Sequence, residues 1–215
     1  MPKTLIDNDI LSKCVIFSLL NEMVVALGHP AAEIGVLGVV RFVISAKRLG
    51  KAQDGGDSAY GRLLSFLDTV ELLEPTEEET AIAAELEALA IKHQVELDIG
   101  ESQLCALAIT RVVEQLYTGD KRAISAIEQL RDSFAPLSNL DQKLVCLEAL
   151  VIALIRIYGH ASIRDAIYLC RGTDKALDIC FQCHNAEAEF TQIDEGLQSY
   201  LQSVLRAAPR VSKIV

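Results

Sequence analysis

Residues 97–126, LDIGESQLCALAITRVVEQLYTGDKRAISA, decide how this chain is expected to fold. The stretch predicts a helix that opens at Gly100, a short strand over 115–118 and a second helix that begins at Lys121. The expected inward positions are Leu104, Cys105, Leu107, Ala108 and Val112 in the first helix, and Ala123, Ile127 and Leu130 in the second. Helices that alternate with strands in this way are typical of a parallel α/β sheet.

Two carboxylates stand at the ends of these elements. Asp120 directly follows the strand, and open α/β sheets bind their ligands beyond the carboxyl ends of their strands. Glu101 lies in the first turn of the first helix, where the helix dipole stabilises a negative charge. We therefore expect Asp120 and Glu101 to serve a common site. Each residue also has a simpler interpretation: Asp120 could be only a helix cap, and Glu101 could only complement the helix dipole.

The amino terminus supplies a third acid. The apolar run 4–6 predicts a first strand that ends at Asp7-Asn8-Asp9, and a single helix is expected from Ile10 to Leu27. Asp7 then lies at the carboxyl end of a strand, as Asp120 does. Asn8 or Asp9 is expected to cap the following helix.

The other elements complete an α/β pattern. Further strands are expected at 70–73, at 144–146 and, less distinctly, just before a helix over 39–48. Thr76 and Glu79 have the spacing of a capping box for a helix that ends near His93. The remaining helices are expected over 60–67, 147–158, 162–170, 174–183 and 188–205, and the tail from Pro209 is expected to fray.

Composition limits the classes of protein and of partner. Hydrophobic residues make up 51% of the 215 positions, which indicates a sizeable core rather than disorder. The formal net charge is −10, so a general basic surface for nucleic acid is absent, although a local basic rim is compatible with it. We find no pattern of an export signal or a membrane span, and expect a cytoplasmic protein whose 6 cysteines are reduced.

Three stretches together resemble the PIN-like nuclease superfamily. They are LIDNDIL at 5–11, LDIGESQLCALAI at 97–109 and LYTGDKRAISAI at 116–127, and they occur in the order of that family. The resemblance implies a three-layer α/β/α fold with a central, mainly parallel sheet. We expect that core at 1–160, because the chain after it is entirely helical and 161–215 then forms a helical C-terminal extension packed on the core.

The resemblance also implies a Mg²⁺- or Mn²⁺-dependent endoribonuclease. Asp7, Glu101 and Asp120 are then the catalytic metal ligands, and a metal-activated water attacks a phosphodiester of single-stranded or structured RNA. The candidates for substrate contact are Thr118, which could instead orient Asp120, and the cations Lys121 and Arg122.

One acid of the family pattern is missing. The segment 36–45, where the family usually carries a further acid, holds Arg41 and no carboxylate. Asp9 or Glu148 could complete the acidic cluster. Because a three-acid site binds metal less well, the fold is predicted more firmly than the activity.

Two other functions remain open. The first is a weakly active or inactive PIN-like module that acts through protein partners, such as an inhibitor or a second copy, in a regulatory or toxin–antitoxin role. The second is a haloacid dehalogenase-like phosphatase, which the Asp7-x-Asp9 spacing resembles, with Asp7 as nucleophile and Asp9 as general acid. Ile10-Leu11 departs from the Gly-Thr that usually follows in that family.

Cysteines near the carboxyl end invite a metal interpretation. Cys180-x-x-Cys183-His184 has the spacing of c-type haem attachment, which we reject because no export signal precedes it. With Cys170, the same residues could supply four zinc ligands. The simpler interpretation is that these thiols are buried on a helix.

Overall fold

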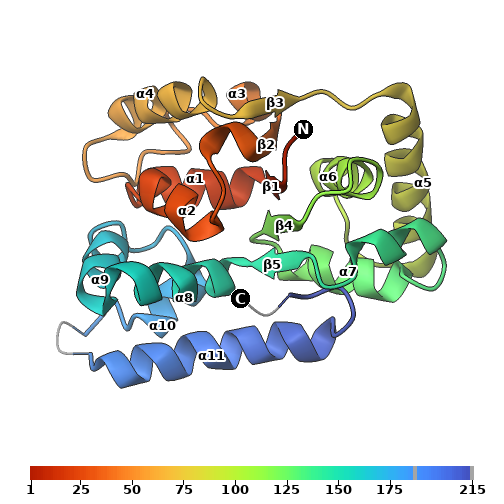
Figure 1. Ribbon diagram of the computed structural model, residues 1–215. Coiled ribbons are helices and arrows are strands. Elements are labelled where there is room, and N and C mark those ends of the chain that lie inside the picture. Colours follow the sequence, from red (N-terminus) through yellow and green to blue (C-terminus); the bar gives the residue numbers. More distant parts are fainter. Residues whose placement is uncertain (186–187, 214–215) are drawn as a thin grey trace.

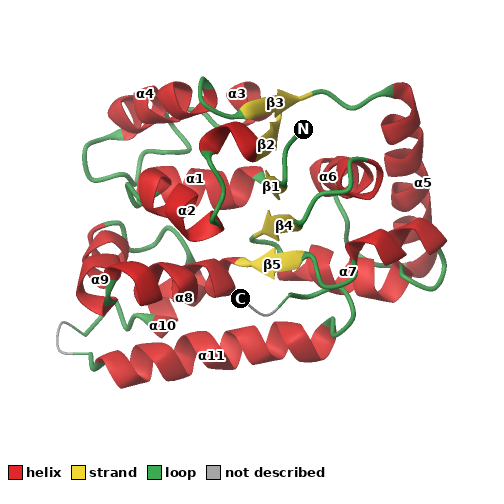
Figure 2. Cartoon of the chain, viewed as in Figure 1, coloured by secondary structure: helices red, strands yellow, loops and turns green. Residues whose placement is uncertain are grey.

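The computed structural model describes residues 1–185 and 188–213, and it confirms an α/β fold around a parallel sheet (Figures 1 and 2). All pairings between neighbouring strands are parallel, and the spatial order is β3-β2-β1-β4-β5. The five strands are β1 (Thr4–Ile6), β2 (Ile34–Leu37), β3 (Glu71–Leu73), β4 (Gln115–Thr118) and β5 (Leu144–Cys146).

The chain order reverses at β1, which lies in the middle of the sheet. Leu5 is in register with Gly35 of β2 on one side and with Leu116 of β4 on the other. Connections therefore leave β1 and β4 in opposite directions, and a crevice opens beyond their carboxyl ends. The sequence places Asp7 and Gly119-Asp120 at that edge.

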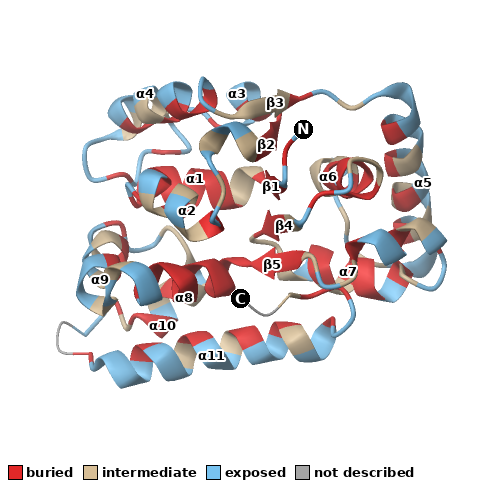
Figure 3. Ribbon diagram, viewed as in Figure 1, coloured by how far each residue is buried: buried red, intermediate tan, exposed pale blue. Residues whose placement is uncertain are grey.

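Helices cover both faces of the sheet, and the buried residues concentrate around the strands (Figures 1 and 3). In Figure 1, α1, α2 and α8 lie on one side of the strands, and α5, α6 and α7 lie on the other. Their bounds are α1 (Asn8–Ile16), α2 (Leu20–Leu27), α3 (Val40–Val43), α4 (Gly56–Leu67), α5 (Glu77–His93), α6 (Ile99–Thr110), α7 (Lys121–Leu130), α8 (Leu147–Tyr158), α9 (His160–Leu169), α10 (Lys175–Cys180) and α11 (Phe190–Ala207).

The single helix predicted from Ile10 to Leu27 is wrong, because two helices occupy this segment. Ser18 has a positive φ of 58°, and its amide bonds the carbonyl of Val15 rather than continuing the helix. The first helix also begins earlier than expected. Asp7, not Asp9, is its N-cap and accepts a hydrogen bond from the amide of Ile10.

Three other helices are shorter than predicted, and one of them, expected over 174–183, is limited to α10. The helix expected over 39–48 is limited to the four residues of α3, because Ile44 turns to an extended conformation. The helix α6 ends at Thr110. Val112 therefore does not point inward: its φ is 51°, and its side chain is 78% exposed.

The carboxyl-terminal helices pack on the rest of the protein. α11 contacts α7, α8 and α10, and buries Ile193, Leu197, Leu201 and Val204. Beyond it, the prediction of a frayed tail is wrong up to Lys213. The amide of Leu144 in β5 bonds the carbonyl of Val211, and Lys213 returns a bond to Leu144. The boundary at residue 160 stays a prediction.

No helix within residues 1–185 and 188–213 combines the length and the apolar character that crossing a membrane requires.

Candidate functional site

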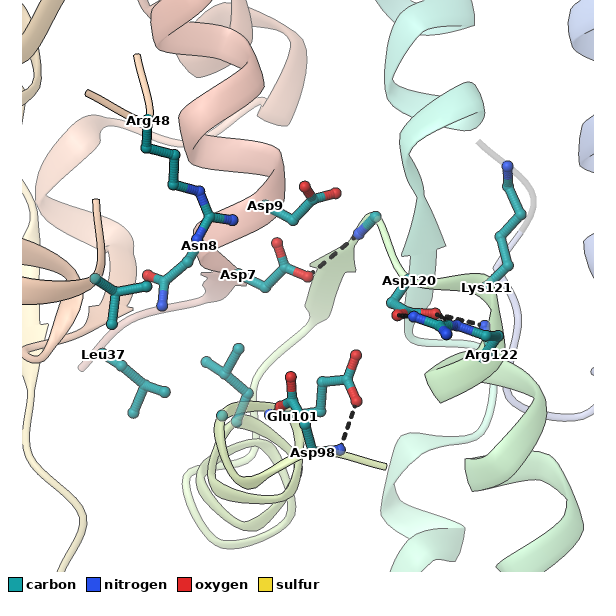
Figure 4. A pocket seen from close by; sticks show the side chains of 14 residues that line it. Asp7, Asn8, Asp9, Leu37, Arg48, Asp98, Glu101, Asp120, Lys121 and Arg122 are labelled. Carbon is teal, nitrogen blue, oxygen red and sulfur yellow. Dashed lines mark hydrogen bonds and ion pairs between the residues drawn. The ribbon is translucent and has the colours of Figure 1, made fainter. Parts of the chain in front are cut away.

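A cavity of about 540 Å³ opens at the carboxyl ends of β1 and β4 (Figure 4). The three acids predicted from the sequence line it, and basic side chains line it as well. The lining residues are Asp7, Asn8, Asp9, Leu37, Val43, Arg48, Asp98, Gly100, Glu101, Leu104, Gly119, Asp120, Lys121 and Arg122. The position agrees with the ligand site expected where the strand order reverses.

Asp7 is the most enclosed acid of the cavity, with 7% of its surface exposed. One carboxylate oxygen accepts from the amide of Ile10 at 2.8 Å; the other accepts from the hydroxyl of Thr118 at 2.6 Å and the amide of Gly119 at 3.2 Å. Burial raises the pKa of Asp7, and these hydrogen bonds oppose that rise. Asp7 thus joins the ends of β1 and β4 and has a fixed orientation.

Of the two roles predicted for Thr118, the geometry agrees with orientation of Asp120 rather than with substrate contact. Thr118 is buried and does not line the cavity. Its hydroxyl donates to Asp7 and accepts from the amide of Asp120 at 3.2 Å, so Thr118 positions one acid and the backbone of another rather than substrate.

Glu101 enters the cavity from the first turn of α6. It forms a reciprocal capping box with Asp98, in which each side chain accepts from the other's amide at 2.8 Å. Burial raises the pKa of Glu101 to about 7, and the negative charges of Asp98, Asp120 and Asp7 add to that rise. The cavity floor is therefore electronegative around Glu101.

Asp120 is the N-cap of α7 and is bound to a neighbouring cation. Its carboxylate accepts from the amide of Arg122 at 2.7 Å and from the guanidinium at 2.8 Å, and Arg122 also pairs with Glu96 at 2.7 Å. Partial burial raises the pKa of Asp120. The hydrogen bonds from Arg122 and its positive charge have the larger effect, so the pKa of Asp120 is lowered. Asp120 is consequently an ionised and partly neutralised acid.

Asp9 is held by a lysine from its own helix. Lys13, only 9% exposed, pairs with Asp9 and also with Asp174, at 2.6 Å, from the loop before α10. Burial lowers the pKa of Lys13, but the charges of both aspartates reverse that direction. Asp174, which belongs to the predicted C-terminal extension, thus helps to hold Asp9 in the cavity through Lys13.

Lys121 makes a second connection to the carboxyl-terminal helices. Its Nζ lies 2.5 Å from Oε1 of Glu148 and 4.7 Å from the ring centre of Tyr200 on α11. Glu148 has no exposed surface, lies outside the cavity lining, and neither of its oxygens accepts a well-directed hydrogen bond from the described residues. The structure therefore places Glu148 behind Lys121 as its counter-charge, and does not bring it to the other acids.

The sequence did not identify Arg48 and Val43 as residues of the cavity. Arg48 belongs to a basic group, with Lys47 and Lys51, that follows an apolar stretch. Its side chain extends toward Asn8 and Asp7 in Figure 4. The sequence pointed to Arg48 only through this basic group.

The acids suit a hard divalent cation by chemistry but do not form a ready-made ligand set. Within the described residues, no three His, Cys, Asp or Glu side chains stand close enough to hold one ion. Asp7, Glu101 and Asp120 face one opening from three elements, yet each already accepts hydrogen bonds from the protein. Among the described residues, Cys170, Cys180, Cys183 and His184 likewise do not form a group that could hold a zinc ion. The three thiols are buried.

Comparison with family models, with curated proteins and with solved structures found no match to this chain.

Proposed function

We propose that the protein is a PIN-like, divalent-metal-dependent nuclease that acts on RNA. One observation carries the proposal: Asp7, Glu101 and Asp120, from distant parts of the sequence, line the same cavity where the strand order reverses. Ligand sites of open α/β sheets lie at this position. An acidic cavity with cations on its wall suits a phosphodiester that reacts beside a metal ion.

The residues of the chain have distinct parts in this proposal. Asp7 is oriented by Thr118 and Gly119, and Glu101 by the capping box, so both carboxylates are held before any ligand arrives. Lys121 and Arg122 lie on the same wall, paired with Glu148 and Asp120, and have to exchange these partners to contact a phosphate. The carboxylates of Asp7, Glu101 and Asp120 would hold a Mg²⁺ or Mn²⁺ ion, which would make a bound water more acidic and offset the charge of the phosphate.

The phosphatase alternative has less support. A general acid at Asp9 has to reach the leaving group of the substrate, but the Asp9 side chain is paired with Lys13 of its own helix. Lys13 is in turn fixed by Asp174. The binding-only alternative has a specific observation in its favour, because Arg122 already occupies Asp120 and no three-ligand cluster is formed among the described residues.

The test is cleavage of a labelled single-stranded RNA in Mn²⁺, Mg²⁺ or EDTA. We expect metal-dependent cutting by the wild type and a loss of about a hundredfold or more in Asp7→Asn and Asp120→Asn, since each removes charge that the reaction requires. Both substitutions keep a side-chain oxygen that can cap the helix.

Glu85→Gln is the matched control, because it removes an exposed acid on α5 that does not line the cavity. It should cut RNA at the wild-type rate. If purified wild type leaves RNA intact in every metal, the nuclease proposal fails and the binding-only function takes its place.

A further inference from the structure

The segment 39–51 has the opposite charge to the rest of the protein. It contains Arg41, Lys47, Arg48 and Lys51 and no acid, in a chain whose formal net charge is −10. It follows β2 and includes α3, and two of its residues, Val43 and Arg48, reach the wall of the acidic cavity. A basic segment therefore borders the proposed reaction site.

Phe42 on α3 is a large apolar side chain with no packing role. It is 88% exposed, and its neighbours Val39 and Val43 are exposed as well. Aromatic rings are usually buried because they carry much apolar area. An open ring one residue from the cavity wall offers a flat surface on which another ring can stack.

Two of the four cations are free to bind an anion. Arg41 pairs with Asp68 at 3.4 Å, and Lys51 donates to the carbonyl of Gly172. Lys47 and Arg48 are exposed, and within residues 1–185 and 188–213 neither side chain has an ion pair or a hydrogen bond. Arg48 extends from the rim toward Asp7 (Figure 4).

We propose that the segment 39–51 is a binding subsite for single-stranded nucleic acid, in which Phe42 stacks on a base while Lys47 and Arg48 contact the adjacent phosphates. This inference rests on the proposed nuclease function, because the strand bound at Phe42 is taken to continue into the cavity that holds the three carboxylates. Stacking on an aromatic ring combined with cations along the backbone is how proteins bind single strands without reading their sequence.

The geometry favours a single strand over a duplex. Asp7 lies at the base of a concave cavity with only 7% of its surface exposed, so the reacting phosphate has to enter that cavity. A flexible strand can bend into it, and its bases are free to stack. The paired bases of a duplex are already stacked on one another and cannot cover Phe42.

Binding is measured separately from cleavage, by fluorescence anisotropy of a labelled uridine oligonucleotide in EDTA over a series of salt concentrations. We expect Phe42→Ala to weaken binding about tenfold without changing the salt dependence, and Phe42→Tyr to restore it. Arg48→Ala and Lys47→Ala should each reduce the slope of log affinity against log salt by about 0.7, the value for one phosphate contact on a single strand.

Ile91→Ala and Lys92→Ala on α5 are the matched controls, since they remove an exposed apolar side chain and an exposed cation away from the cavity. Both should bind as the wild type does. Equal affinity of Phe42→Ala and wild type, or a duplex that binds as well as the single strand, would overturn the subsite. Strand binding with these signatures but no cleavage in Mn²⁺ or Mg²⁺ leaves the subsite standing as a binding surface and rejects the nuclease.

Discussion

At the scale of single residues, Glu101 connects the charge of the cavity to the stability of the fold. Its pKa is about 7 in the folded protein, against an ordinary value of 4.5, chiefly because it is buried. The folded state therefore holds the proton more tightly than the unfolded state does. This stabilisation is complete below about pH 4.5 and is lost as the pH rises through 7.

We predict that Glu101→Gln is more stable than the wild type at pH 8, by about 1–2 kcal/mol after solvent screening is allowed for, and equal to it near pH 4. The amide oxygen of Gln can still accept from Asp98. Urea unfolding at the two pH values measures the difference. A stability gap of the same size at both pH values would contradict the assignment of the effect to ionisation.

Gly119 is the second residue-scale test. A Cβ at this position would meet Oδ2 of Asp9 and lie 3.3 Å from Nζ of Lys13. We predict that Gly119→Ala destabilises the protein by about 1–3 kcal/mol, because the Asp9–Lys13 pair has to move. Thermal unfolding provides the measurement.

Gly61→Ala is the control for Gly119→Ala. Gly61 lies inside α4, and a Cβ added there would have no neighbouring atom within 4 Å. Alanine at this position should stabilise the helix by about 0.5–1 kcal/mol. Similar losses in the two variants would show that the contact with Asp9 has no part in the effect.

The sequence predicted the acids of the cavity because each has a local signal. Asp7 and Asp120 follow short apolar strands, and Glu101 opens a helix, so parallel pairing was enough to bring them to one edge. Arg48 and the Asp174–Lys13 pair had no such signal. Arg48 reaches the cavity only through the irregular path that follows α3, and Asp174 approaches Lys13 only through packing of distant helices.

At the scale of elements, the junction of α5 and α6 depends on one buried acid. Glu79 completes the capping box with Thr76 and also accepts from Nε and Nη2 of Arg111, at 2.7 and 2.8 Å. The hydrogen bonds of Arg111 lower the pKa of Glu79 to about 2. The resulting stabilisation is present above about pH 4.5 and is lost as the pH falls toward 2.

We predict that Glu79→Gln costs about 2 kcal/mol at pH 7, since it leaves Arg111 without its counter-charge, and that the loss disappears near pH 2. Denaturant unfolding between pH 2 and 7 tests this. Glu78→Gln, which changes an exposed acid in the same turn, should remain within about 0.5 kcal/mol of the wild type. A loss from Glu79→Gln that persists at pH 2 would assign the effect to packing instead.

Two helix ends differ from those that the apolar pattern of the sequence predicted. The apolar spacing continues through Ser18, so it could not show that Ser18 would adopt a positive φ and separate α1 from α2. It also continues to Val112, although the chain has already left α6 to enter β4. Strand positions were better predicted, because β4 and β5 are short, largely buried segments, each followed closely by residues that begin a helix.

At the scale of the whole molecule, the carboxyl-terminal helices contribute to one core. We predict that Leu201→Ala on α11 destabilises the protein by about 2–4 kcal/mol, since Leu201 is buried against other helices. Gln202→Ala, on the exposed side, should change stability by less than about 0.5 kcal/mol.

Circular dichroism and the fluorescence of the tyrosines should report one shared transition for Leu201→Ala, as a single cooperative unit requires. Two separate transitions would show that the segment from residue 161 onward unfolds as an independent domain.

The bond between Thr118 and Asp7 joins residues 111 positions apart, and this separation has a consequence for protein synthesis. Asp7 leaves the ribosome before Thr118, which emerges on the order of ten seconds later at ordinary translation speeds. During that interval one edge of the central strand β1 lacks its partner, because β2 can pair only with the other edge. Completion of the acidic cavity is therefore a late event of folding, timed by translation of β4.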